Sequence, residues 1–176
     1  REAIGTLRGE GLVVDEHGRG AFVRSSELEP LIRRISPAQS YKSARNVFED
    51  QVTEAGQAAS IREIPLSSDE ARLPELARLP SDVDPVHEAW LGFADGRPIS
   101  VTHTWRSPAG TPEGDGLTER VSARMPTRNE RRLLQLHEGA PVIELVRSLT
   151  VHRETVEVSI SLLAAERQSL FFDFGG

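Results

Sequence analysis

The chain has 176 residues, no cysteine and a formal net charge of −6, which exclude a disulfide scaffold, a cysteine-based metal site and a strongly basic nucleic-acid-binding body. No run approaches the roughly 18 apolar residues of a membrane span, and no secretory signal opens the chain, so we expect a cytoplasmic protein. The length suits one domain of ordinary size, or one domain with a small module in front of it.

Residues 1–24 predict the last turns of a helix followed by a short hairpin. Ile4 and Leu7 share one helical face, and Gly11 ends that pattern, as glycines at helix ends do. A strand at residues 12–14, a tight turn at His17-Gly-Arg-Gly20 and a return strand at residues 21–24 complete the hairpin. The charges of residues 1–24 sum to zero, so the net negative charge lies in residues 25–176, which we do not expect to bind a phosphate backbone.

The next segment predicts a linker and then a helix. Residues 25–40 carry two prolines and four serines and read as a linker, with a short helical piece at residues 31–35. A helix over residues 41–55 ends at Gly56. The residues predicted to share its apolar face are Ala44, Val47, Phe48 and Val52.

Two strand hairpins are predicted downstream, and they are related by a weak internal repeat. The first pairs residues 86–93 with 98–106 around an Asp-Gly turn, and the second pairs residues 142–151 with 155–164. The two align at an offset of 57 residues, each with a short helix in front. Further strands are expected at residues 58–66, 118–123 and 170–174, a helix after Ser67, and a capping box at Thr127–Glu130 that opens a helix at residues 130–136. Two helix-plus-hairpin copies sharing one sheet predict an α+β domain with a largely antiparallel sheet.

Two stretches resemble a known family. Residues 1–24 resemble the end of the winged helix-turn-helix of GntR-family regulators, a recognition helix followed by a wing. Residues 40–174 resemble the UTRA ligand-sensing domain of HutC-type members of that family, and the nearest branch is similar to phosphonate-utilisation regulators. The motifs that carry this second resemblance are Ala94-Asp-Gly-Arg-Pro-Ile99, Arg124-Met-Pro-Thr127 and Leu134-Gln-Leu-His-Glu-Gly-Ala-Pro-Val-Ile-Glu-Leu-Val-Arg147.

The resemblance implies a ligand-responsive transcriptional repressor rather than an enzyme. It implies a chorismate-lyase-like fold, a homodimer, operator DNA as the partner of the full-length protein, and a pocket for a small-molecule effector, for which an anion is one candidate. The expected divisions are a truncated winged-helix module over 1–24, a linker over 25–40 and a UTRA domain over 41–176. No membrane partner, cofactor or metal is expected, because no phosphate-binding loop, nucleophile elbow or metal-ligand spacing of histidines is present.

The tip of the predicted wing carries the candidate DNA contacts. Arg19 stands between two glycines, so it can enter a narrow minor groove with no side chain obstructing the backbone. The alternative is an ordinary exposed turn that contains an arginine. The candidate DNA-binding residues are Arg1, His17, Arg19 and Gly20.

The candidate effector site is built from polar residues of the predicted strands. Arg147 shares a face with two leucines, so it either binds a carboxylate or phosphonate in a pocket or faces solvent. Glu157 accepts ligand hydroxyls, pairs with Arg147 or lies on a solvated face, and Thr104 and Arg106 line either a polar pocket or an exposed strand. The full set of candidates is Arg45, Thr104, Arg106, Arg124, Arg147 and Glu157.

One departure from the family pattern bears on the effector. Family members that bind phosphosugars commonly carry arginines where this chain has Ala89-Trp90-Leu91, and Trp90 is either core or a ligand platform. The absence of these arginines favours a less charged, partly aromatic or apolar effector. Two alternatives stay open: a dimeric scaffold whose pocket is vestigial, and a lyase-like enzyme that uses Arg147 with Glu157.

Overall fold

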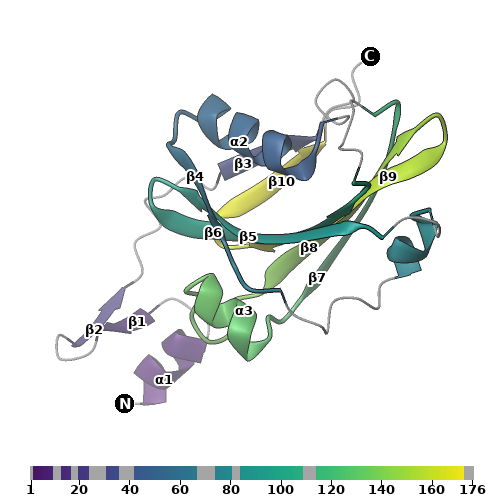
Figure 1. Ribbon diagram of the computed structural model, residues 1–176. Coiled ribbons are helices and arrows are strands. Elements are labelled where there is room, and N and C mark those ends of the chain that lie inside the picture. The colour runs from purple at the N-terminus through teal and green to yellow at the C-terminus, as the bar shows by residue number, and fades with distance from the viewer. Residues whose placement is uncertain are drawn as a thin grey trace.

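The computed structural model of the chain describes residues 2–9, 13–16, 20–23, 31–35, 42–66, 74–80, 84–108 and 114–172. Its body is a six-stranded antiparallel sheet in the order β4-β5-β6-β9-β8-β7 (Figure 1). Within the described ranges, none of the helices is long and apolar enough to cross a membrane. The strands of the sheet are β4 (Ala59–Glu63), β5 (Val86–Ala94), β6 (Arg97–Arg106), β7 (Gly116–Arg124), β8 (Val142–Val151) and β9 (Glu154–Ala164).

The two predicted hairpins are confirmed, and they sit symmetrically in the sheet. Asp95 and Gly96 turn the first with φ of 48° and 75°, and His152 and Arg153 turn the second with φ of 50° and 69°. Two successive left-handed residues suit a hairpin because they match the twist of the strands. The turns lie at the predicted offset, and β6 meets β9 at the centre, so β4-β5-β6 and β7-β8-β9 form two equivalent halves.

Helix α2 (Ala44–Glu54) covers one face of the sheet (Figure 1). It begins at the N-cap Ser43, whose hydroxyl accepts from the Asn46 N–H, and the four residues predicted to share its apolar face are all buried. The Phe48 ring packs against Trp90, with ring centroids 5.2 Å apart. A Cβ on Gly92 would lie 2.5 Å from the Phe48 ring, so glycine at this strand position lets the helix close onto the sheet.

The opposite face is covered by α3 (Arg128–Leu133) and by the 3₁₀ turn η2 (Pro74–Arg78). The capping box predicted at the start of α3 is present, with Thr127 and Glu130 bonding each other's backbone. The core on this face is formed by apolar strand residues that alternate with those packed under α2. They include Leu91, Val101, Leu134, Val142 and Leu162.

The N-terminal segments follow the predicted helix-then-hairpin pattern. They are α1 (Glu2–Gly9) and the antiparallel pair β1 (Val13–Glu16) and β2 (Gly20–Val23). The predicted helical piece at 31–35 is wrong. These residues form β3 (Leu31–Ile35), which pairs in parallel with β10 (Gln168–Phe172) in a separate two-stranded sheet. Pairing with a segment more than a hundred residues away decides the structure here, and local periodicity does not contain that information.

Candidate functional site

A cavity of about 360 Å³ lies between the N-terminal end of α2 and the sheet. This volume is within the range of sites for small molecules. Most of its lining residues are polar or charged, which distinguishes it from the apolar core beneath the rest of α2. The lining residues are Ser43 and Arg45 at the start of α2, Glu63 on β4, Glu88 and Trp90 on β5, Thr104 and Arg106 on β6, and Glu157 on β9.

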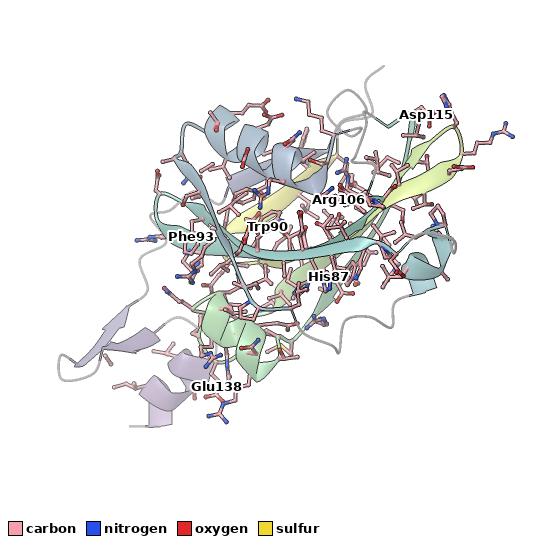
Figure 2. All side chains as sticks on the ribbon, in the orientation of Figure 1. His87, Trp90, Phe93, Arg106, Asp115 and Glu138 are labelled. Carbon is pink, nitrogen blue, oxygen red and sulfur yellow. The ribbon has the colours of Figure 1, made fainter. Side chains whose placement is uncertain are left out.

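Strand register explains why these polar residues meet. Glu63 lies opposite Trp90, Glu88 opposite Thr104, and Arg106 opposite Glu157. Residues directly opposite one another in antiparallel strands share a face of the sheet, and alternation keeps the next polar residue on that face. Figure 2 shows Trp90 and Arg106 on the α2 side of the sheet, whereas His87 lies on the other side.

Two buried charges fix the start of α2 to the sheet. Glu157, 2% exposed, accepts a 2.9 Å hydrogen bond from the Ala44 N–H through Oε1. Arg147, 3% exposed, donates from Nη1 to the Lys42 carbonyl at 2.6 Å, and its Nε lies 3.6 Å from Glu119. Burial lowers the pKa of Arg147, while the nearby carboxylates Glu119 and Glu157 oppose that shift.

The other charges of the cavity differ in whether they are paired. Arg106 donates from Nη2 to Glu88 at 2.7 Å across the β5–β6 pair. Arg45 is half-buried on the first turn of α2, and within the described part of the chain its guanidinium has no hydrogen bond or ion pair. A guanidinium beside a helix N-terminus is suited to an anionic ligand group.

The hydroxyl of Thr104 is buried in the cavity wall without a partner. Thr104 is 5% exposed, and its Oγ1 makes no hydrogen bond to any described residue. Two residues earlier on the same strand, Thr102 Oγ1 bonds Ser161 Oγ at 3.0 Å. A buried hydroxyl without a partner costs roughly 1–3 kcal/mol, so the unpaired Thr104 needs an explanation, and a bound ligand would supply one.

The structure brings four of the six predicted effector-binding residues into this one cavity. Arg45, Thr104, Arg106 and Glu157 line it, although Glu157 is also committed to the Ala44 N–H. Arg147 lies on the same face of the sheet but is not among the lining residues, because it holds the Lys42 carbonyl.

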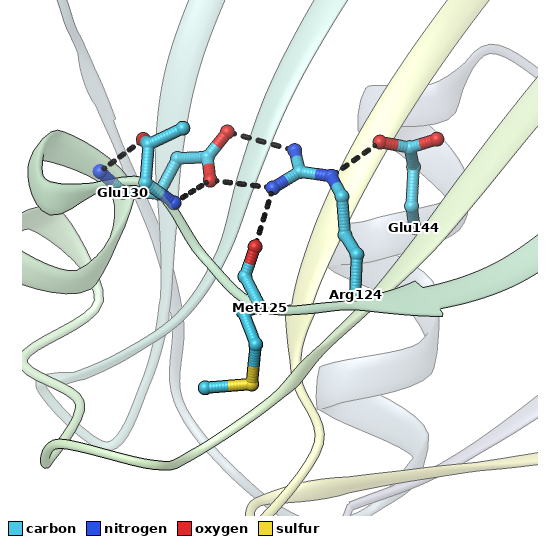
Figure 3. Close-up of polar contacts among 5 residues, drawn as sticks. Arg124, Met125, Glu130 and Glu144 are labelled. Carbon is cyan, nitrogen blue, oxygen red and sulfur yellow. Dashed lines mark hydrogen bonds and ion pairs between the residues drawn. The ribbon is translucent and has the colours of Figure 1, made fainter.

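Arg124 lies apart from this cavity, in a bonding arrangement that ties α3 to the sheet (Figure 3). Its guanidinium donates to both carboxylate oxygens of Glu130 and, through Nε, to Glu144, each at 2.8 Å. Hydrogen bonding to Glu130 raises the pKa of Arg124. These contacts give Arg124 a structural explanation, and it does not line the cavity under α2.

Sequence reasoning did not select Ser43, Glu63 or Glu88 as site residues. A signal for Glu88 was available, because it lies two residues before Trp90 on a strand and therefore shares its face. Trp90 is part of the core, since it is 2% exposed and packs against Phe48. It also borders the cavity, and its role as a ligand platform stays a prediction. Glu63 could not be selected from the sequence, because it lies on an edge strand whose neighbour and orientation depend on the order of strands in the sheet.

Of the candidate DNA-binding residues, Arg1, His17 and Arg19 lie outside the described residues. Gly20 begins β2 with a φ of 112°, a conformation that favours glycine and fits a tight hairpin tip.

Two further polar features lie on the face of the sheet opposite α2. His87 stacks on Trp105, with centroids 4.3 Å apart, and its Nε2 is 3.3 Å from His103 Nδ1. Burial and the neighbouring His87 lower the pKa of His103 to about 4. A second, more open cavity lies at α3, and its lining includes Arg128, Arg131 and Arg132.

Comparison with known proteins identifies the fold. Neither a protein-family model nor a curated protein matches the sequence. Among solved structures, PhnF from Mycobacterium smegmatis matches with a TM-score of 0.65 and 15% identity, covering 100% of this chain and 84% of that one. The possible transcriptional regulator YydK from Bacillus subtilis gives a TM-score of 0.59 at 12% identity, covering 99% of this chain and 81% of its own.

The match also holds for isolated effector domains. The C-terminal domain of the histidine utilization repressor from Pseudomonas syringae matches with a TM-score of 0.55 and 15% identity, covering 68% of this chain and 100% of that domain. The fold is therefore that of the UTRA effector domains of GntR-family regulators, which confirms the predicted fold class. The neighbours named here are transcriptional regulators, not enzymes.

Proposed function

We propose that the chain is the effector-sensing part of a ligand-responsive transcriptional regulator, with the cavity under the start of α2 as the effector site. The observation that carries the proposal is the buried hydroxyl of Thr104 beside the guanidinium of Arg45, neither of which has a hydrogen-bond partner among the described residues. A cavity that is only a packing defect has no reason to bury a polar group without a partner, because the cost is not recovered.

DNA binding would belong to the N-terminal module. A helix followed by a hairpin at α1, β1 and β2 is the order expected for a recognition helix and its wing, with Arg1, His17, Arg19 and Gly20 as the candidate contacts. We retain the division into 1–24, 25–40 and 41–176 as a proposal, with β3 now lying inside the middle segment.

The start of α2 offers a route by which an effector would act on the preceding chain. Ser43 and Arg45 line the cavity, and between them Ala44 is bonded to Glu157. A ligand that changes this arrangement would change how the segment leading from β3 joins the sheet. For regulation, the effector must bind the conformation that does not bind DNA more tightly, by a typical coupling of about 1–3 kcal/mol.

A homodimer is part of the proposal, because two winged modules are needed to read two half-sites. The edge strand β7 offers a surface for it: Val121 is 43% exposed, and Met125, directly after the strand, is 58% exposed. Sedimentation equilibrium of the wild type and of Val121→Lys tests this. A wild-type monomer at micromolar concentration would contradict the dimer.

The lyase-like alternative is less well supported by the site. An enzyme using Arg147 and Glu157 needs both groups free for substrate, but each is buried and bonded to the backbone at the start of α2. The vestigial-pocket alternative predicts no ligand at all, and the experiment below distinguishes it from a sensor.

The test is thermal unfolding of the chain against a panel of small anions, phosphonates, sugar phosphates and aromatic acids. A ligand at 100 times its Kd adds about 2.7 kcal/mol of stability, which is visible as a shift in melting temperature. The shift should be lost in Arg45→Gln and Thr104→Val but kept in Arg97→Gln, at an exposed turn. A hit that survives both cavity substitutions would contradict the assignment of the site.

A further inference from the structure

The charges around the α2 cavity are largely neutralised by one another. Glu88 is paired with Arg106 at 2.7 Å, and Glu157 is bonded to the Ala44 N–H and acts electrostatically on Arg147. Two charged side chains of the lining, those of Arg45 and Glu63, are not neutralised in this way. Within the described ranges of the chain, neither the half-buried side chain of Arg45 nor the exposed side chain of Glu63 has a hydrogen bond or ion pair.

The two remaining charges are opposite in sign and come from different walls. Arg45 belongs to the first turn of α2, next to the N-cap Ser43, where the helix dipole adds to its positive potential. Glu63 ends β4 and lies opposite Trp90 on β5, so its carboxylate and the indole are neighbours on one face. The cavity therefore has one end suited to an anion and another suited to a cation.

We propose that the effector is a zwitterion, a small molecule with one anionic group and one ammonium group; this inference rests on the proposed function of the cavity. The anionic group binds Arg45 at the start of α2. The ammonium group binds Glu63, which lies opposite Trp90 in the lining of the cavity. The hydroxyl of Thr104, on the strand beside Glu88, hydrogen-bonds a polar group of the bound ligand.

The same charges disfavour ligands with negative charge alone. Three carboxylates, Glu63, Glu88 and Glu157, line the cavity against two guanidiniums, so a doubly charged phosphate ester would meet a net negative lining. A zwitterion gives Arg45 and Glu63 each an opposite partner and adds no net charge to the cavity.

The experiment is calorimetric titration of the 176-residue chain with the L-α-amino acids and with phosphoethanolamine, each beside its N-acetyl form, which lacks the positive charge. We expect at least one zwitterion to bind, and its N-acetyl form to bind at least about tenfold more weakly. Glu63→Gln should abolish that difference, and Arg45→Gln should weaken both forms. Glu49→Gln and Arg97→Gln, exposed residues outside the cavity, are the matched controls and should bind like the wild type.

Two results would overturn the inference. In the first, an N-acetyl form binds as tightly as its parent, or Glu63→Gln changes nothing. In the second, none of these zwitterions binds. If a sugar phosphate or aromatic acid then binds in a manner that depends on Arg45 and Thr104, the proposed sensor function stands and only the ligand class is wrong.

Discussion

The carboxylate of Glu157 on β9 accepts a 2.9 Å hydrogen bond from the backbone N–H of Ala44, 113 residues earlier in the chain. One strand away, Arg147 donates a hydrogen bond from Nη1 to the backbone carbonyl of Lys42. The first turn of α2 is thus positioned by two buried charges in addition to the packing of its apolar side chains. Because this turn also supplies Ser43 and Arg45 to the cavity, the shape of the cavity depends on these two bonds.

Loss of the Glu157 charge should destabilise the fold. Glu157→Gln keeps the size of the side chain and an acceptor oxygen, but it leaves Arg147 with one fewer compensating carboxylate. We expect a loss of about 1–3 kcal/mol in the free energy of unfolding, measured by urea denaturation. Glu154→Gln, at the exposed start of the same strand, should stay within about 0.5 kcal/mol of the wild type. Equal effects of the two substitutions would contradict a special role for Glu157.

The two buried threonines of β6 should respond in opposite directions to the same substitution. Thr104→Val removes a hydroxyl that has no described partner, so stability should be unchanged or rise by about 1 kcal/mol while effector binding is lost. Thr102→Val leaves Ser161 without its hydrogen-bond partner and should cost about 1 kcal/mol. Thermal unfolding of both variants, with and without ligand, measures both effects. A destabilised Thr104→Val would indicate that its hydroxyl is already satisfied.

Arg124 should be a stability residue and not a ligand residue. Arg124→Gln breaks the bonds to Glu130 and Glu144 that connect α3 to β7 and β8. The side chain is 36% exposed, so solvent screening limits the expected loss of unfolding free energy to about 1 kcal/mol. Effector affinity, measured by titration, should equal that of the wild type. A selective loss of affinity at full stability would restore Arg124 to the effector site.

Stability should fall with acid because of His103. Its pKa is about 4 in the folded chain against 6.5 as the ordinary value, so the neutral form is the one compatible with the fold. The unfolded chain binds the proton first, so this stabilising contribution is full above pH 6.5 and is lost as the pH falls toward 4. The total effect is on the order of 3 kcal/mol.

Urea denaturation of the wild type and of His103→Asn between pH 7.5 and 4.5 measures this dependence. The variant should lose less stability over that range, whereas His152→Asn, in an exposed turn, should follow the wild type. Parallel pH profiles for the wild type and His103→Asn would show that another group is responsible.

Most strands of the sheet could be predicted from the sequence. Local signals are sufficient for hairpins, because a two-residue turn such as Asp95-Gly96 and alternation along the flanking strands are both encoded within about twenty residues. The capping box at Thr127 is local in the same way. The internal repeat indicated that the two hairpins are equivalent, and the order of strands in the sheet agrees with this.

Features that depend on distant pairing were not predictable. The assignment of β3 required its partner β10, and the positions of Arg147 and Arg124 depended on what lay across from them. Arg147 alternates with leucines, which indicated its face but not that a backbone carbonyl would occupy its guanidinium. The motif containing Arg124 suggested function, although its two carboxylate partners give it a structural role.

The most direct test is to locate a bound ligand on the chain by amide chemical-shift mapping with the first compound that stabilises it. The account predicts that the largest shifts fall on Ser43 to Asn46, Glu63 and Thr104, around the cavity under α2. Largest shifts at the second cavity, around Arg128, Arg131 and Arg132 of α3, would contradict it and move the effector site to the other face of the sheet.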